Sequence, residues 1–242
     1  MTAKSLPQTE HYLEMENHMI ICKAQDLNKT YYDDSREINS IINCNIEIKE
    51  GECVVICGDK DAGKSTLLHI LGGFERPTSG SVYIDQKDIT AYSDDELAIM
   101  RRREIGFLLQ NDSLIPELNV HENIIMPAIL AHTKYNDAYY HSLINSLRIK
   151  DILYLYPKQL HADQLQCVMY ARSLINNPKI ILMDETSGNT DLNRKIMDFL
   201  FNVVYLYHKT LIMVNSDGLD QMSVNHIIRL KNGEVIENRL IS

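Results

Sequence analysis

The sequence predicts an α/β fold with a parallel sheet at its core, an N-terminal antiparallel β segment and a helical insert. Continuous apolar runs at residues 53–57, 180–183 and 211–214 are typical of parallel strands that are buried on both faces. Residues 18–50 alternate between apolar and polar, which favours antiparallel strands with one wet face. Helical patterns lie between the first two runs, and they place the insert inside the sheet region.

The helical patterns have clear starts and periods. Ser93 with Glu96 forms a capping box ahead of Leu97 and Met100, which predicts the start of a helix. Apolar residues recur near the helical period over two further segments, residues 120–130 and 138–149. The end of the chain differs, because the stretch Lys231-Asn232-Gly233-Glu234 predicts a closing hairpin.

Composition limits the class of protein. The chain has 242 residues, of which 45% are hydrophobic, and this suits one domain with one sizeable core. We expect residues 1–17, which are polar and aperiodic, to form a mobile tail, and residues 18–242 to form the domain, with the helical subdomain inserted at approximately 111–162. The net charge of −9 argues against nucleic acid as a partner.

The sequence shows no run of about 18 apolar residues and no signal-peptide pattern, so we expect a cytoplasmic protein. Its five cysteines are odd in number and form no CxxC pair. These features argue against a disulfide framework and against a zinc site, and they favour plain buried thiols.

A phosphate-binding loop follows the first apolar run. The stretch matches G-x-x-x-x-G-K-[ST] and reads Gly58-Asp59-Lys60-Asp61-Ala62-Gly63-Lys64-Ser65-Thr66. Backbone N–H groups of such a loop point inward, and the following helix adds its positive N-terminal end. Lys64 would reach the β- and γ-phosphates and Ser65 would bind Mg²⁺. A chance match in a glycine turn is the alternative, but the strand and helix around the motif favour a P-loop NTPase (RecA-like) core.

Three consecutive arginines, Arg101 to Arg103, leave two interpretations open. They are compatible with a polyanion site or with a solvated helix face, and we prefer the second interpretation.

Further motifs follow in a set order along the chain. They are Gly106-Phe-Leu-Leu-Gln110, Tyr156-Pro-Lys-Gln-Leu160-His161-Ala162-Asp163-Gln164, Ala171-Arg-Ser-Leu174, Asn177-Pro178, Ile181-Leu-Met-Asp184-Glu185 and Gly188-Asn-Thr-Asp191. In order and spacing the chain resembles the ABC ATPases from about Ile20 to its end. The stretches around Ser93, Leu114 and Glu122 are most similar to the lipoprotein-export and macrolide-export branch, in which the ATPase serves a separate permease.

The resemblance implies roles for individual residues. Tyr31 would stack on adenine, Asp184 and Gln110 would hold Mg²⁺ and the attacking water, and Glu185 would act as general base. ATP and Mg²⁺ are the implied cofactors. Tyr31 is also compatible with ordinary packing beside Tyr32, and Gln110 with a polar residue at the end of a loop.

The chain departs from the family pattern most strongly in the signature Leu-Ser-Gly-Gly-Gln. Leu160 and Gln164 remain, whereas the three residues between them are His161, Ala162 and Asp163. In the family dimer this loop closes on the γ-phosphate of ATP held by the other subunit. Asp163 would bring a carboxylate there, and two unit charges about 4 Å apart interact by about 4 kcal/mol at an effective dielectric constant of about 20.

Other departures point in the same direction. Ser216 stands in place of the H-loop histidine, Cys167 in place of an arginine-like residue, and Asp61 in place of a glycine in the phosphate loop. Drift in a subunit whose paired ATPase hydrolyses ATP is one account. Selection for binding without turnover is the other, although the retained Glu185 argues against it.

The preferred function is the ATP-binding subunit of an ABC transporter, a homodimer or a heterodimer with another ABC ATPase. It would lie on the cytoplasmic face of the membrane beneath a permease subunit, hydrolysing ATP slowly. An ATP-gated regulatory partner of a membrane protein is the alternative. A soluble ABC protein of DNA repair or translation is disfavoured, because the chain has neither a long coiled-coil insertion nor a second ATPase domain.

Overall fold

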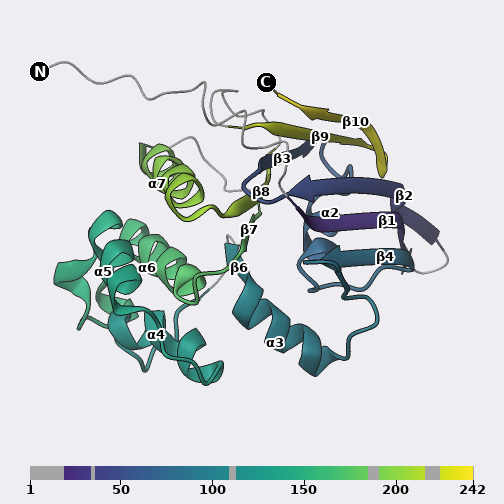
Figure 1. Ribbon diagram of the computed structural model, residues 1–242. Coiled ribbons are helices and arrows are strands. Elements are labelled where there is room, and N and C mark those ends of the chain that lie inside the picture. Colours follow the sequence, from purple (N-terminus) through teal and green to yellow (C-terminus); the bar gives the residue numbers. More distant parts are fainter. Residues whose placement is uncertain (1–18, 34–35, 109–112, 185–190, 216–223, 242) are drawn as a thin grey trace, which may run out of the picture.

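The computed structural model describes residues 19–33, 36–108, 113–184, 191–215 and 224–241. The expected tail at residues 1–17 lies outside these ranges. Figure 1 shows helices gathered on one side of a central sheet and a second sheet on its other side. This arrangement confirms the α/β fold class.

The central sheet has six strands in the order β10-β9-β3-β8-β7-β6. Five of them run parallel, and β10 pairs antiparallel with β9. The strands are β3 (Cys53–Gly58), β6 (Ile105–Leu108), β7 (Ile180–Met183), β8 (Thr210–Val214), β9 (His226–Lys231) and β10 (Glu234–Leu240). All three apolar runs therefore form adjacent parallel strands, as predicted, and the carboxyl ends of β3, β8 and β7 meet at one edge.

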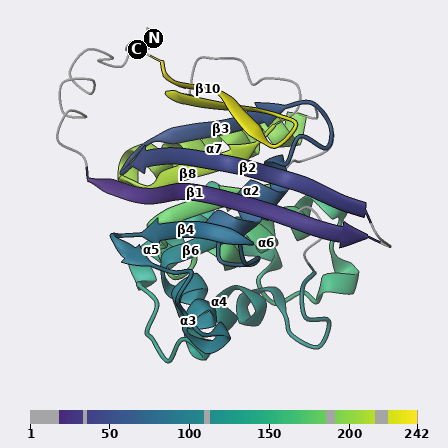
Figure 2. The same ribbon diagram turned by 90° about the vertical axis from the view of Figure 1, so that its right-hand side faces the viewer.

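The second sheet has four antiparallel strands in the order β2-β1-β4-β5. They are β1 (Ile20–Asp33), β2 (Arg36–Lys49), β4 (Ser79–Ile84) and β5 (Lys87–Asp88). The face of this sheet is seen in Figure 2. Helix α2 (Lys64–Leu71) packs between the two sheets, because its Leu67 and Leu71 share one apolar cluster with residues of both.

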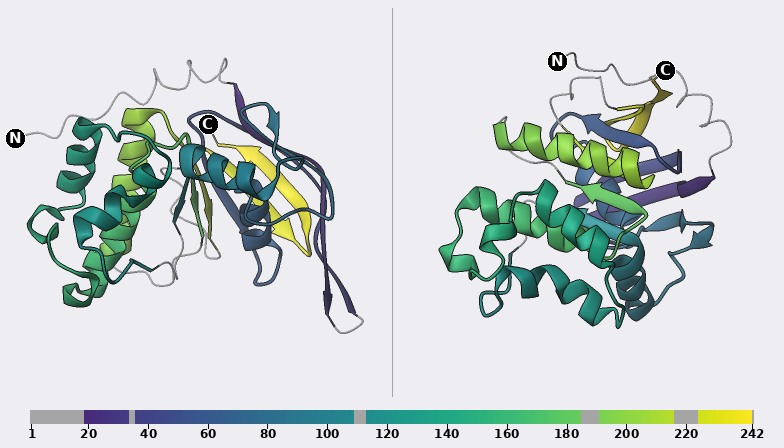
Figure 3. Two further views of the ribbon diagram at one scale, coloured as in Figure 1. Left: turned by 90° about the horizontal axis from the view of Figure 1, so that it is seen from below. Right: turned by 60° about the vertical axis from the view of Figure 1, so that its left-hand side comes forward.

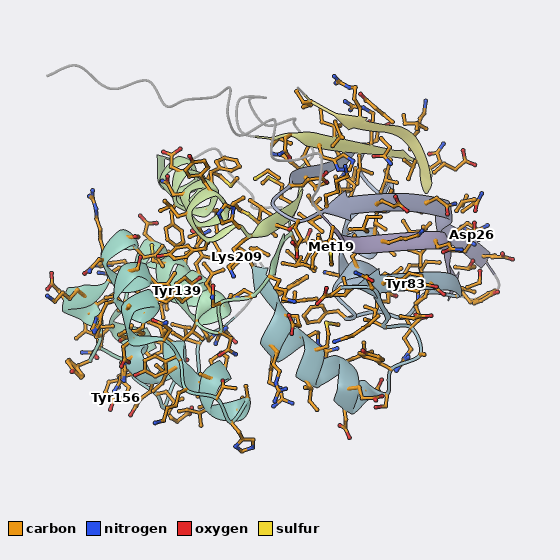
Figure 4. All side chains as sticks on the ribbon, in the orientation of Figure 1. Met19, Asp26, Tyr83, Tyr139, Tyr156 and Lys209 are labelled. Carbon is orange, nitrogen blue, oxygen red and sulfur yellow. The ribbon has the colours of Figure 1, made fainter. Side chains whose placement is uncertain are left out.

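The remaining helices cover the opposite face of the central sheet or extend from its edge (Figure 3). They are α3 (Asp94–Glu104), α4 (Val120–Leu130), α5 (Asp137–Ser146), α6 (Ala162–Leu174) and α7 (Asp191–Tyr207). Short 3-10 turns at Lys150–Ile152 and Pro157–Gln159 join α5 to α6. Figure 4 labels Tyr139 and Tyr156 among these helices, well apart from Asp26 and Tyr83 in the antiparallel sheet.

Two helix predictions are confirmed and one is corrected. Helix α3 starts at the predicted capping box, since Ser93 N–H donates to Glu96 Oε2 at 2.8 Å. Helix α4 has the predicted bounds. Helix α5 ends at Ser146, short of the predicted residue 149, because Arg148 adopts a left-handed φ of 55°. Arg148 N–H then donates to Asn145 O and Ile149 N–H to Ile144 O, which closes the helix as a Schellman motif.

The cysteines lie where the sequence predicted. Cys22, Cys44, Cys53 and Cys57 are buried, and Cys167 is half-buried. Burial raises the pKa of Cys22, Cys44 and Cys53 to about 12. These three thiols therefore stay protonated at neutral pH and act as apolar packing groups. Among the described residues, none of the helices combines the length and the apolar character that a membrane span requires.

Three hydrogen-bonded polar side chains, His226, Glu52 and Asn238, lie beside the start of β3. His226 Nδ1 is 2.8 Å from Glu52 Oε2, its Nε2 is 2.6 Å from Asn238 Oδ1, and both His226 and Glu52 are buried. Burial alone would lower the pKa of His226, but the hydrogen bonds to Glu52 and Asn238 and the charge of Glu52 together raise it. The folded protein therefore holds the His226 proton more tightly than the unfolded chain does.

This group predicts a pH dependence of stability. A raised pKa contributes stability that is fully present below the unfolded value near 6.5 and is lost as pH rises through the folded value. The difference in unfolding free energy between wild type and His226→Gln should therefore shrink from pH 6 to pH 9, measured by denaturant unfolding. His141→Gln, at an exposed position in α5, is the control. A difference that stays constant over this range would contradict the assignment.

Candidate nucleotide-binding site

The phosphate loop joins β3 to α2 and is shaped by two close backbone approaches. A Cβ atom at Gly63, where φ is 97°, would lie 2.2 Å from Ser40 O on β2. A Cβ atom at Gly58 would lie 2.2 Å from Leu230 O on β9. Glycine is required at both positions because these contacts leave no room for a side chain.

Asp61 explains how the loop tolerates the loss of a family glycine. Its φ of 62° lies in the left-handed region, which glycine adopts freely and aspartate adopts more readily than most residues. Asp59, Lys60 and Asp61 are all exposed, whereas Ala62 is buried. The turn is thus kept, and a negative charge is added at its surface.

The side chain of Lys64 folds back over this loop. Its Nζ donates to Gly58 O at 2.9 Å and to Asp59 O at 2.8 Å, and the residue is only 6% exposed. The ammonium group therefore lies at the loop, beside the N-terminus of α2. A buried cation next to a helix N-terminus suits an anionic ligand such as a phosphate chain.

Asp184 follows β7 directly and reaches the first turn of α2. Ser65 Oγ donates to Asp184 Oδ1 at 3.0 Å, and His69 Nε2 lies 3.6 Å from Asp184 Oδ2. The hydrogen bond with Asp184 raises the pKa of His69 against the opposing effect of burial. A hydroxyl and a carboxylate oxygen placed together are hard ligands of the kind that Mg²⁺ prefers.

His69 was not singled out from the sequence. It lies four residues after Ser65, so one face of α2 presents both side chains to the same carboxylate. The four-residue spacing of Ser65 and His69 is the sequence signal for this shared face.

Tyr31 lies on the face of the antiparallel sheet that meets α2. It pairs with Ile38, and Ser40, two residues further along β2, donates through its hydroxyl to Thr66 Oγ1 at 3.0 Å. Tyr31 is 36% exposed, and its hydroxyl donates to Glu75 Oε2 at 2.6 Å. The ring is thus beside the end of the phosphate loop and partly open to solvent.

The altered signature lies at the start of α6. His161 is the residue before the helix, and its N–H donates to Gln164 Oε1 at 3.0 Å. Asp163 is exposed in the first turn, where its carboxylate occupies the positive end of the helix. Helix α6 lies on the helical side of the central sheet, apart from α2 (Figure 1). The structure therefore does not bring His161, Asp163 and Gln164 to the phosphate loop of the same chain.

Three predicted catalytic residues, Gln110, Glu185 and Ser216, fall outside the described residues. Their roles stay predictions.

The interpretation of the arginine run as a solvated face is wrong for two of its members. Arg101 donates to Gly73 O at 2.6 Å and Arg102 to Leu130 O at 2.8 Å, and both are half-buried. Only Arg103 is exposed. The first two arginines tie α3 to the segment after α2 and to the end of α4, because backbone carbonyls lie within their reach.

Comparisons with known proteins agree with this geometry. The family model described as ABC transporter matches residues 41–188. The lipoprotein-releasing system ATP-binding protein LolD of Cytophaga hutchinsonii is 34% identical, over 89% of this chain and 99% of its own length. The uncharacterized ABC transporter ATP-binding protein MJ0796 of Methanocaldococcus jannaschii is 38% identical, over 88% of this chain and 94% of its own length.

Solved structures support the same assignment. The dimeric post-hydrolysis state of the cassette MJ0796, bound to ADP and Pi, superposes with a TM-score of 0.80 at 34% identity, covering 91% of this chain and 99% of that one. The chain therefore belongs to the ABC transporter family, as one of its ATP-binding subunits.

Proposed function

We propose that this chain binds ATP with Mg²⁺ and couples ATP binding and slow hydrolysis to a separate membrane permease. The observation that carries the proposal is the convergence of Lys64, Ser65 and Asp184 at the carboxyl ends of β3 and β7. Ligands of open α/β sheets bind at this edge. A lysine, a helix N-terminus and a pair of oxygen ligands fit a nucleotide phosphate chain with its metal ion.

Each predicted site residue has a separate role in phosphoryl transfer. Backbone N–H groups of residues 58–66 and the ammonium of Lys64 would hold the phosphates, while Ser65, Asp184 and Gln110 would hold Mg²⁺. Mg²⁺, when bound, neutralises phosphate charge. Glu185 would orient and polarise the attacking water, Ser216 would take the place of the histidine at the γ-phosphate, and Tyr31 would stack on the base.

A dimer supplies the part of the site that one chain lacks. The cassette MJ0796 has been solved as a dimer, and helix α6, at whose start His161, Asp163 and Gln164 lie, is apart from α2 in this chain (Figure 1). We infer that they face ATP bound to a second ABC ATPase, either another copy or a different subunit. Such a pair would lie peripherally on the cytoplasmic face of the membrane.

We assign residues at approximately 111–162 to a helical subdomain that docks the permease. LolD relatives belong to a lipoprotein-releasing system, which makes a lipoprotein-handling permease the partner to test first. Several large apolar side chains of this segment are exposed: Ile115, Ile129, Leu130, Tyr154 and Tyr156. Exposed apolar patches of this kind often mark protein interfaces.

Charge placed on this segment should separate docking from nucleotide binding. Ile129→Glu and Tyr154→Glu should abolish copurification of the permease from native membranes, because each buries a charge at the contact. Affinity for ATP should not change. Ile236→Glu is the matched control, since Ile236 on β10 is 54% exposed and Ile129 is 55% exposed. If the permease still copurifies with both the Ile129→Glu and the Tyr154→Glu variants, this segment is not the docking site.

A second candidate function is an ATP-gated regulatory partner of a membrane protein. Asp163 favours it, because an exposed carboxylate at the start of α6 opposes closure on a phosphate. The identity of the copurified membrane protein separates the two. A multi-span permease supports the transporter subunit, and a single-span signalling protein supports the regulator.

A further inference from the structure

A charged cluster surrounds Tyr31 and joins the antiparallel sheet to the end of α2. Lys29 Nζ lies 2.9 Å from Glu75 Oε1 and donates to Arg76 O at 2.8 Å. The other carboxylate oxygen of Glu75 accepts the hydroxyl proton of Tyr31. The same Lys29 Nζ lies 4.9 Å from the centre of the Tyr31 ring. One ammonium and one carboxylate thus hold the aromatic side chain at two points.

Each of these contacts fixes a different degree of freedom of the ring. The hydrogen bond to Glu75 fixes the position of the phenol oxygen, and the cation beside the ring disfavours rotation of the ring away from Lys29. Burial, followed by the hydrogen bond to Glu75, raises the pKa of Tyr31, so the phenol keeps the proton that it donates. The side chains of Lys29 and Glu75 are only 15% and 24% exposed, which limits screening of the pair by water.

The cluster is also anchored to the phosphate loop through the backbone. Glu75 follows α2 closely, and its N–H donates to His69 O in that helix. Helix α2 begins at Lys64 of the phosphate loop. The position of the Tyr31 ring is therefore set relative to the same helix that receives the phosphates.

We propose that Glu75 and Lys29 are positioning residues for nucleotide recognition, which hold Tyr31 ready to stack on the base. The proposal rests on the assignment of Tyr31 to the base in the proposed function. A ring that is already held in place loses less side-chain entropy when ligand binds, and this effect is worth roughly two- to tenfold in affinity for one side chain. The gain applies only to ligands that carry a base.

Comparison of two ligands tests the proposal directly. ATP has a base, whereas inorganic tripolyphosphate presents the phosphate chain alone, and both are titrated with Mg²⁺ present. Tyr31→Ala should weaken ATP binding by roughly five- to hundredfold and leave tripolyphosphate unchanged. Glu75→Ala, Lys29→Met and Tyr31→Phe should each weaken ATP roughly two- to tenfold, again without effect on tripolyphosphate.

Two further comparisons sharpen the test. Glu75→Gln keeps an acceptor for the phenol and should bind ATP more tightly than Glu75→Ala. Tyr31→Phe combined with Glu75→Ala should lose no more ATP affinity than Glu75→Ala alone, because Glu75→Ala already removes the hydrogen bond that Tyr31→Phe removes. Glu47→Ala is the control, since Glu47 pairs with Lys23 at 2.9 Å in the same sheet and should leave both ligands unaffected. Thermal unfolding confirms that each variant is folded.

The outcomes distinguish the positioning role of Glu75 and Lys29 from the assignment of Tyr31 to the base. If Tyr31→Ala weakens ATP binding and Glu75→Ala does not, the positioning role is overturned and the base assignment stands. If Glu75→Ala weakens tripolyphosphate as much as ATP, Glu75 supports the phosphate loop and the proposal is also overturned. If Tyr31→Ala leaves ATP affinity intact, the base assignment itself fails, and the positioning role fails with it.

Discussion

Lys64→Ala should lower the affinity for ATP by roughly 10- to 150-fold, which is the range expected for the loss of a hydrogen bond to a charged group. The ammonium of Lys64 is the buried cation of the loop, and its current partners are the carbonyls of Gly58 and Asp59. These neutral acceptors yield to a phosphate, because a charged acceptor binds the ammonium more strongly. Equilibrium titration with ATP and Mg²⁺ measures the effect.

The control for this experiment is Lys87→Ala, which removes an exposed lysine from β5 in the other sheet. It changes the net charge by the same amount and should leave ATP affinity unaltered. Chelation of Mg²⁺ should weaken binding to wild type, since Ser65 and Asp184 offer their oxygens to the metal ion. Equal affinity for ATP in wild type and Lys64→Ala would contradict the assignment of the nucleotide site.

The purified chain alone should hydrolyse ATP slowly or undetectably, and Asp163→Gly combined with Ser216→His should raise the rate. In a homodimer each composite site contains the Ser216 of one copy and the Asp163 of the other, so both sites carry both changes. The double substitution removes a carboxylate from the start of α6 and restores a γ-phosphate contact. Release of phosphate under saturating ATP and Mg²⁺ measures the gain, and a roughly tenfold to hundredfold increase is expected after screening of the charge by solvent.

Each single substitution should recover less than the pair, because the remaining change still limits both sites. The same pair of changes placed in Glu185→Gln should give no gain, since that variant lacks the general base. Robust turnover by the unmodified chain, abolished by Glu185→Gln, would show that the altered signature is tolerated. In a heterodimer the two changes fall in different sites, and the site that has Ser216 but an ordinary partner signature should then be the faster one.

The sequence predicts correctly those parts of the fold that are specified by residues close together in the chain. The phosphate loop, the strand before it and the hairpin at Asn232 each depend on glycine, apolar runs or turn residues within a few positions. The start of α4 follows in the same way from Asn119 and Glu122, which cap its first turn. Strand β4 was not predicted, because its pairing partner β1 lies far away in the sequence and the strand begins with Ser79 and Gly80, which are poor strand formers.

The contacts around the site depend on tertiary structure, and sequence could not supply them. Tyr31 was assigned to the base by resemblance, but its bond to Glu75 forms only when β1 packs against the segment after α2. His69 reaches Asp184 only because β7 ends beside α2. The end of α5 was missed for a related reason, since Arg148 gives no local sign that it adopts the left-handed conformation usually taken by glycine.

Backbone hydrogen bonds of the hairpin between β9 and β10 also determine when the phosphate loop can form. Gly233 N–H donates to Ala62 O, and Ile42 N–H donates to Gly233 O, so the hairpin between β9 and β10 closes on both the loop and β2. Contacts between segments this distant in sequence form late in folding, after the cost of loop closure has been met. On the ribosome the loop leaves the exit tunnel long before β9 and β10 do. A nascent chain therefore completes its nucleotide site only after β9 and β10 have emerged, and ATP bound at that site then stabilises the folded domain.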